Sequence, residues 1–345
     1  MKRKIHIFSH SEKITTAQSF KKLKIKNFSV NFYNNKKKIN FNKNDIILHV
    51  DPCNFICFDP LEETQIKGIY LIDTHRDFKS RLQISKMFDF VFVAQYLDAQ
   101  KLKKYNKNTY WVPLGFDTTI KLKEKYKKIY QVGFVGKLNT FDKYSKERTN
   151  LISLVLKKYT SNIQKFVSTR KCYEIYKKSQ FVINKSIGND LNMRVFEAMG
   201  NGAVLITDKI SNKLNVLFKR NYHYLEYKDK HDCLNILQNF IEKRSKKKDE
   251  KLKKISSRAM DLVLKKHTYQ ERLNFIVQKM SAKKKLYKSF SKKTKLASLF
   301  FFHFYHCDLI FFYKFLIKNK NISLTFVFYF VMTIVKKIFR KYRYA

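Results

Sequence analysis

Glycine, proline and acidic residues are scarce in this sequence of 345 residues, and the first two shortages exclude whole classes of protein. With seven glycines and three prolines, the chain is neither collagen-like nor a Gly/Pro-rich low-complexity chain. Its five cysteines are scattered and lack zinc-finger spacing, so we expect reduced thiols in a cytoplasmic protein. The first residues, MKRKIHIFSH, have no apolar stretch typical of a signal peptide and predict a first strand.

The chain has only 27 acidic residues against 73 Lys and Arg, which gives a formal net charge of +46. A balance this basic usually points to polyanions or an anionic membrane as partners. Lysine outnumbers arginine 61 to 12, however, whereas nucleic-acid surfaces favour arginine for bidentate contacts. The excess of Lys, Asn, Ile, Phe and Tyr is typical of an AT-rich coding bias, so we expect no specific nucleic-acid partner.

Hydrophobic residues make up 44% of the chain and aromatic residues 16%, which is enough apolar surface for two folded domains. Short apolar runs alternate with helix-compatible segments, a pattern typical of βαβ units. The expected strands are KIHIFSH (4–10), DIILHVD (45–51), GIYLIDTH (68–75), DFVFVAQ (89–95), TYWVPLGFD (109–117), YQVGFVGK (130–137), FVINKS (181–186) and AVLITD (203–208). The expected helices are 16–25, 78–88, 145–159, 192–199, 231–245 and 250–280.

This alternation predicts an α/β fold of two Rossmann-like domains, residues 1–118 and 129–280, joined by a lysine-rich linker. Ligands of α/β proteins bind beyond the carboxyl ends of parallel strands, so we expect the site in a cleft between the two sheets. His10, Asp73 and His75 follow expected strands in the first domain. Each of them is equally explained as an ordinary polar residue at a strand end.

The segment LNMRVFEAMGNGAVLITD, residues 191–208, holds two of the seven glycines. It predicts a helix, a tight turn and a strand, with Gly200 and Gly202 ending the helix. The N-terminus of that helix offers backbone N–H groups and a positive dipole end to a diphosphate. Glu197 lies about one and a half turns in, where its carboxylate can accept hydrogen bonds from the vicinal hydroxyls of a ribose. The alternative is a plain αβ turn with Glu197 paired to a lysine.

This segment resembles the donor site of GT-B glycosyltransferases, in which a Glu is followed by Ala-Met and, after a glycine, by an apolar strand. The similarity is greater to the spore-protein CgeB/YkvP-like branch of glycosyltransferase family 1/4. There, LNMRVFEA follows a strand similar to YEIYKKSQFVINKS (173–186), and a VGFVGK strand precedes a helix that bears an Arg. HTYQERL (267–273), YLIDTHRD (70–77) and DFVFVAQ complete the resemblance, which covers roughly residues 45–280.

The resemblance implies a GT-B fold, two Rossmann-like domains facing a cleft, and roles for individual residues at the donor site. It assigns Glu197 to the donor ribose and the backbone N–H groups of Asn192 and Met193 to the diphosphate. Gly136 and Lys137 form the other loop that faces the phosphates. The donor is a nucleotide-diphosphate sugar, and no further cofactor is required.

The resemblance leaves open the roles of three neighbouring residues, Arg194, Asn189 and Asp190. Arg194 either adds positive charge near the phosphates or lies on the outer surface. Many GT-B enzymes have a second Glu eight positions before the ribose Glu, where this sequence has Asn189 followed by Asp190. This departure leaves open which residue contacts the sugar and whether its configuration is retained.

The expected reaction moves the sugar to a glycan, a lipid-linked saccharide or a protein. No DxD motif follows an expected strand, so we expect no metal, with lysines and a helix N-terminus stabilising the leaving diphosphate. An inverting reaction needs a base for the acceptor hydroxyl, for which Asp73 and His75 are the first candidates and His10 the second. Two alternatives remain: a sugar-nucleotide epimerase of the same fold, and a non-enzymatic basic protein that binds nucleic acid or a membrane surface.

Residues 281–345 depart from the α/β pattern, because basic runs there flank strongly aromatic ones. The last apolar run, ISLTFVFYFVMTIV, has 14 residues, short of the roughly 20 that span a bilayer. We therefore expect a buried or interfacial helical hairpin. Its lysines suit docking on an anionic membrane, at the inner face for a cytoplasmic protein, and the alternative is packing on the protein itself or on a second subunit.

Overall fold

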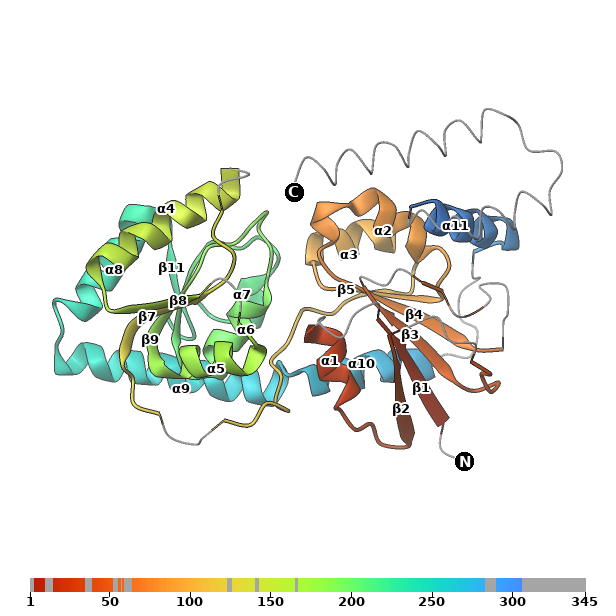
Figure 1. Ribbon diagram of the computed structural model, residues 1–345, viewed down its shortest axis with the longest axis horizontal. Coiled ribbons are helices and arrows are strands. Elements are labelled where there is room, and N and C mark those ends of the chain that lie inside the picture. Colours follow the sequence, from red (N-terminus) through yellow and green to blue (C-terminus); the bar gives the residue numbers. More distant parts are fainter. Residues whose placement is uncertain are drawn as a thin grey trace.

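The computed structural model describes residues 3–9, 15–34, 39–51, 55, 56, 58, 64–122, 126–139, 143–164, 167–282 and 290–305. These residues form two parallel sheets with helices on their faces, one sheet in each of two domains that lie side by side (Figure 1). The α/β fold expected from the sequence is confirmed. His10 and the tail from residue 306 onward lie outside the described residues.

The first domain contains a six-stranded parallel sheet in the order β2-β1-β3-β4-β5-β6. Its strands are β1 (Arg3–Phe8), β2 (Phe28–Tyr33), β3 (Ile46–Val50), β4 (Ile66–Leu71), β5 (Phe90–Val93) and β6 (Thr109–Trp111). β3 and β5 are buried along their whole length, which explains why their sequences are nearly continuous apolar runs. β2 was not expected, because its sequence FSVNFY mixes polar and apolar residues that are all half-buried at the sheet edge. The helices of this domain are α1 (Thr15–Lys21), the 3-10 turn η1 (Thr74–Arg76), α2 (Phe78–Ser85) and α3 (Tyr96–Lys103).

The second domain contains a five-stranded parallel sheet in the order β11-β10-β9-β7-β8. Its strands are β7 (Tyr130–Val135), β8 (Ser161–Gln164), β9 (Ser179–Asn184), β10 (Val204–Asp208) and β11 (Leu225–Tyr227). Its helices are α4 (Lys143–Lys158), α5 (Thr169–Lys178), α6 (Met193–Gly200), α7 (Leu214–Leu217), α8 (Lys230–Ile241) and α9 (Lys246–Lys266). The strand expected at 181–186 is β9, whereas residues 173–178, which the family resemblance placed in the same strand, belong to α5. Ser168 starts this helix by accepting a hydrogen bond from the N–H of Lys171.

Two chain segments cross between the domains and pair with each other. The N–H of Phe116, in the linker after β6, donates to the carbonyl of His267, and the N–H of Tyr269 donates to the carbonyl of Phe116. Gly115 permits this approach, because a Cβ there would lie 3.0 Å from the backbone carbon of Thr268. The crossing holds the end of the linker against the start of the last long helix.

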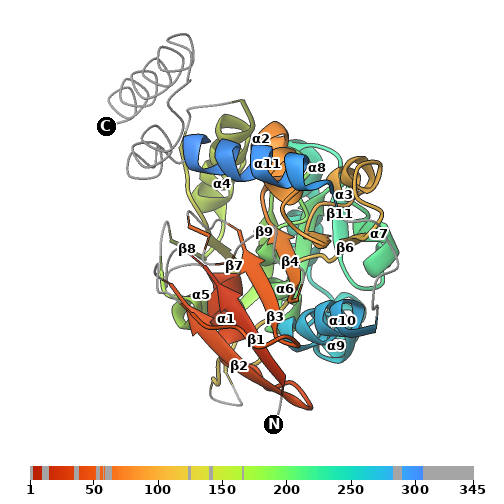
Figure 2. The same cartoon turned by 90° about the vertical axis from the view of Figure 1, so that its right-hand side faces the viewer.

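That helix, α10 (Tyr269–Ala282), packs on the first domain rather than the second (Figure 2). Met280 contacts β4 at Gly68, where a Cβ would lie 2.8 Å from the methionine sulfur. The guanidinium of Arg272 donates to the carbonyl of Pro113 at 2.8 Å. The expected second domain, 129–280, includes α10, whose apolar face is buried on the first sheet.

One apolar cluster continues from the first sheet into the second domain. At its centre the rings of Phe116 and Tyr173 stack with centroids 4.8 Å apart and planes at 8°, and Phe196 of α6 belongs to the same cluster. Close-packed interiors have low compressibility. This shared core therefore fixes the orientation of the two sheets relative to each other.

The described start of the tail is α11 (Lys292–Tyr305), which packs against α2 of the first domain. Phe302 is buried in the apolar cluster on that side of the sheet, and the buried Lys295 has its ammonium 4.0 Å from the carboxylate of Asp89. Among the described residues, no helix is both long and apolar enough to cross a membrane. This part of the tail therefore packs on the protein itself.

Candidate active site

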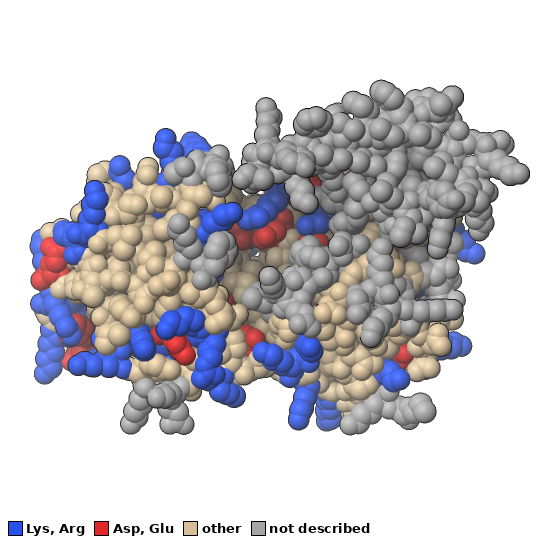
Figure 3. Space-filling view, viewed as in Figure 1, with Lys and Arg blue, Asp and Glu red and all other residues tan. Residues whose placement is uncertain are grey.

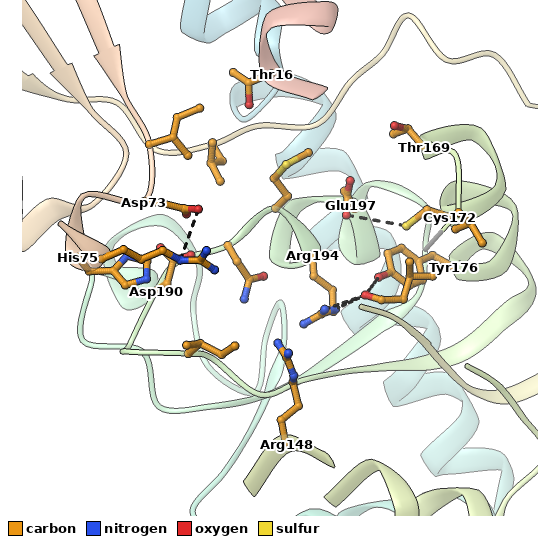
Figure 4. A pocket seen from close by; sticks show the side chains of 18 of the residues that line it. Thr16, Asp73, His75, Arg148, Thr169, Cys172, Tyr176, Asp190, Arg194 and Glu197 are labelled. Carbon is orange, nitrogen blue, oxygen red and sulfur yellow. Dashed lines mark hydrogen bonds and ion pairs between the residues drawn. The ribbon is translucent and has the colours of Figure 1, made fainter. Parts of the chain in front are cut away.

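A cavity of about 490 Å³ lies between the two domains and is lined by residues of both. Its volume falls within the range of small-molecule binding sites. Figure 3 shows a hollow between the domains in which acidic and basic side chains lie close together, and Figure 4 shows the lining side chains converging from opposite walls. This is where the sequence predicted a cleft at the carboxyl ends of two sheets.

The charged residues of the cavity do not follow the composition of the chain. Its cations are Arg76, Arg148 and Arg194, and among the described lining residues there is no lysine, although the chain has 61 lysines and only 12 arginines. The expectation that lysines stabilise the diphosphate is therefore corrected: in the described lining, arginines take their place. Arginine presents a planar, permanently charged fork that matches phosphate and carboxylate groups, so the cavity is suited to an anion.

Glu197 lies on α6 and lines the cavity, with only 8% of its surface exposed. Its carboxylate faces Cys172, whose Sγ lies 4.0 Å from Oε2 (Figure 4). Burial raises the pKa of Glu197 to about 7, the charge of Asp117 adds to this rise, and Arg194 opposes it. The expected alternative, a pairing with a lysine, is absent from the described residues. A buried acid without a cationic partner costs stability, which indicates a role toward a ligand.

The two glycines that follow this helix serve different purposes. Gly202 has a φ of +70°, the left-handed conformation that ends a helix and favours glycine. Gly200 is still helical, and a Cβ on it would lie 2.5 Å from the ring of Phe116. The expectation that both glycines make the turn is therefore corrected: Gly200 allows α6 to pack against the linker, which brings Glu197 to the domain interface.

Arg194 points into the cavity rather than to the outer surface (Figure 4). Its guanidinium donates to the carbonyl of Val135 and to Oδ1 of Asn184, both at 2.7 Å, and lies over the ring of Phe134 at 4.3 Å from the centroid. Within the described ranges no carboxylate forms an ion pair with it. A cation held in place by neutral groups remains available to a bound anion.

Arg148 was not among the expected site residues. It reaches the cavity from α4, is 8% exposed, and donates to the carbonyl of Lys137. The sequence does contain a signal for Arg148: it is the one arginine on α4, whose other basic residues are all lysines. An arginine at such a position indicates a specific role, because its rigid fork can contact a carbonyl and an anion at the same time.

Three expected donor residues do not line the cavity. Lys137 has an exposed side chain and contributes only its carbonyl. Asn189 is exposed, has a left-handed φ of 59°, and accepts a hydrogen bond at its carbonyl from Asn212. Gly136 lies beneath Arg194, and a Cβ there would lie 2.5 Å from its Nη2. Their roles toward a donor, as expected from the sequence, remain predictions.

Substitution of Gly136 by Ala should displace the guanidinium of Arg194, because the new methyl group would occupy its place. We expect roughly tenfold weaker binding of a nucleoside diphosphate, since a displaced charge-assisted hydrogen bond is worth about 1.5–3 kcal/mol. Calorimetric titration measures this effect. If it arises through Arg194, Gly136→Ala should have little further effect in an Arg194→Lys background, and full additivity would contradict the explanation.

The other end of the cavity carries Asp73, His75 and Asp190 (Figure 4). One polar atom from each lies within 4.8 Å of the others. Arg76 places its Nε 3.7 Å from the carboxylate of Asp73, and Gln95 donates to Asp190 at 2.9 Å. These groups are near enough together to surround a cation, but their own arginine and amide already contact both carboxylates, and we assign no metal.

Donor binding should depend on pH through Glu197. A carboxylate accepts hydrogen bonds from two ribose hydroxyls, whereas the protonated form accepts fewer, and its pKa is about 7 in the free protein. Affinity for a nucleotide sugar should therefore fall about tenfold from pH 8 to pH 6, in proportion to the ionised fraction. Titration with a diester such as UDP-glucose avoids a titrating phosphate, and a flat profile would contradict the role of Glu197.

Residues 121–278 match a family model described as glycosyl transferase-like. This stretch, which contains the second sheet and α6, therefore resembles a glycosyltransferase domain. No curated protein matches the chain at a significant level. Among solved structures, Anabaena HepE in complex with UDP and glucose has a TM-score of 0.55 at 10% identity, covering 81% of this chain and 100% of that one. A glycosyltransferase from Rickettsia africae has a TM-score of 0.51 at 11% identity, covering 82% and 100%. These likenesses show the GT-B fold.

Proposed function

We propose that this glycosyltransferase moves a sugar from a nucleoside-diphosphate donor to a hydroxyl of a glycan, a lipid-linked saccharide or a protein. The observation that carries the proposal is the wall of the cavity on which Arg148 and Arg194 lie beside the start of α6, with the buried Glu197 one turn further along. An anion and a diol are the two groups that such a wall recognises.

In this proposal the diphosphate lies at the N-terminus of α6. The first N–H groups of a helix have no intrahelical partner and its dipole favours an anion, so the N–H groups of Asn192 and Met193 face the phosphates together with the two arginines. Glu197 is four residues after Met193, about 6 Å along the helix axis at 1.5 Å per residue. That spacing suits a nucleotide whose ribose hydroxyls reach the carboxylate.

The chemical step requires stabilisation of the negative charge that develops on the leaving diphosphate. As the bond from the sugar to the diphosphate breaks, negative charge builds on the leaving group, where Arg148, Arg194 and the helix dipole are already in place. The acceptor enters from the first domain, where His75 and Asp73 are the described candidates for the base. His10, which lies outside the described residues, stays a candidate from the sequence.

A uridine-diphosphate sugar is the first donor class to test, because HepE, which shares the fold, has been solved with UDP-glucose. The protein should release nucleoside diphosphate from at least one donor in a panel of UDP-, GDP-, ADP- and TDP-sugars, and the release should accelerate with acceptor. Failure to bind or to turn over every donor would contradict the proposal.

The resemblance of LNMRVFEA and HTYQERL supports placing the chain in the CgeB/YkvP-like branch. The lysine-rich tail supports contact with an anionic membrane at the cytoplasmic face. An epimerase of the same fold would convert a nucleotide sugar without acceptor, so chromatography of that reaction separates the two activities. A basic binding protein would retain DNA or RNA at physiological salt, whereas a merely lysine-rich surface loses it steeply.

A further inference from the structure

Asp190 belongs to the donor-side domain, but its hydrogen-bond partner belongs to the other domain. Its carboxylate is 7% exposed and accepts a hydrogen bond at 2.9 Å from the side-chain amide of Gln95, which follows β5. The side-chain oxygen Oε1 of Gln95 lies 3.0 Å from the hydroxyl of Thr74, which in turn lies 2.7 Å from a carboxylate oxygen of Asp98. This buried chain of polar groups holds the Asp190 carboxylate at the edge of the first sheet.

His75 lies directly after the fully buried Thr74 and is covered by the loop that carries Asp190. Gly188 of that loop has a φ of +61°, and a Cβ on it would lie 3.3 Å from Cδ2 of the imidazole. Nδ1 of His75 is buried and has no hydrogen-bond partner among the described residues. The imidazole thus lies at the domain interface with one nitrogen available.

The charged groups around this imidazole are the carboxylates of Asp73 and Asp190 and the guanidinium of Arg76. Asp73 is on the same short turn as His75, whereas Asp190 comes from the loop between β9 and α6. One oxygen of each carboxylate lies within 4.8 Å of a ring nitrogen, so each domain contributes a carboxylate to the surroundings of this imidazole.

We infer that Asp190 is a positioning residue of the transfer step, acting through His75 and not through the donor. The inference rests on the proposed function. The acceptor oxygen forms its bond to the anomeric carbon while its proton passes to the imidazole of His75. The bond from that carbon to the diphosphate oxygen breaks, and its electron pair leaves with the nucleoside diphosphate.

Asp190 orients the imidazole for this transfer and balances the charge that it gains, as carboxylates do for catalytic histidines. Because the carboxylate and the imidazole come from different domains, the base is complete only when the domains face each other as they do here. Water entering an open cleft would then meet an incomplete base, which protects the donor from hydrolysis.

The test is Asp190→Asn, which keeps the volume and leaves an oxygen to accept from Gln95. We expect kcat to fall at least about 30-fold, within the range of acid–base contributions, with the donor KM and the dissociation constant of the nucleoside diphosphate changed less than about twofold. Asp261→Asn, at an exposed position on α9, is the matched control and should behave as wild type. His75→Gln should lower kcat at least as far, and the double variant should be no slower than His75→Gln.

Several outcomes would overturn the inference. A raised donor KM with unchanged kcat would make Asp190 a donor contact, and a full further loss in the His75→Gln background would separate it from His75. Loss of wild-type activity in EDTA, with recovery on adding Mg²⁺ or Mn²⁺, would make the cluster a metal site. A wild-type protein that turns over no nucleotide sugar would instead contradict the proposed function.

Discussion

Replacement of Glu197 by Gln should weaken donor binding at pH 8 by on the order of 100-fold or more, because two charge-assisted hydrogen bonds to the ribose lose their anionic acceptor. The carboxylate is buried beside Cys172 and lines the cavity, so the amide fits in the same volume. Calorimetric titration with the nucleotide sugar that the panel identifies measures the loss. Glu250→Gln, at an exposed position on α9, should leave the affinity unchanged.

The same substitution should stabilise the ligand-free protein, which separates lost binding from lost folding. The pKa of Glu197 is about 7 when folded, against 4.5 for an ordinary glutamate. Between these values the folded state holds a proton that the unfolded state has released, so stability falls as pH rises. Above pH 7 Glu197→Gln should gain up to about 3 kcal/mol in the free energy of unfolding. A destabilised variant that also fails to bind would leave the ribose role without support.

Replacement of Arg194 by Lys should lower kcat/KM by on the order of 100-fold, although the charge is kept. The guanidinium holds Val135 and Asn184 with separate nitrogens and covers the Phe134 ring, which an ammonium on a flexible chain cannot do together. A misplaced cation stabilises the leaving diphosphate less. Steady-state kinetics with saturating acceptor measures the effect.

Arg244→Lys is the matched control for that experiment, because Arg244 pairs with Asp249 at the surface and is 68% exposed. It should leave kcat/KM unchanged, since exposed ion pairs contribute little. If Arg194→Lys retained full activity, the selection of arginine over lysine in the cavity would have no functional meaning, and the anion site would need another explanation.

Much of the fold was predictable from the sequence, since buried strands such as IILHV and FVFV leave an unmistakable apolar run. β2, β8 and β11 were missed because all three are edge strands of mixed polarity. The packing of α10 on the first domain was not predictable from its own residues. An amphipathic helix reveals that it has a buried face, but which sheet covers that face is decided by the crossing at Phe116.

The site was predictable where one segment carries it and not where two domains share it. Asn192, Met193, Arg194 and Glu197 all lie on or next to α6 and all line the cavity, because helical spacing places them together. Gln95 lies 95 positions before Asp190 in the chain, and their hydrogen bond exists only because two sheets face each other. No local sequence pattern predicts such a contact, and only the end of a strand and the resemblance of YLIDTHRD pointed to His75.

The central claim is that a nucleoside diphosphate binds between the domains at the start of α6. Hydrogen–deuterium exchange with and without saturating UDP, and in parallel GDP and ADP, tests it most directly. At least one nucleotide should slow exchange of the backbone amides at residues 192–195 and at the end of β7, while α8 and α9 keep their rates. Protection elsewhere on the surface, with unchanged exchange at the start of α6, would contradict the account.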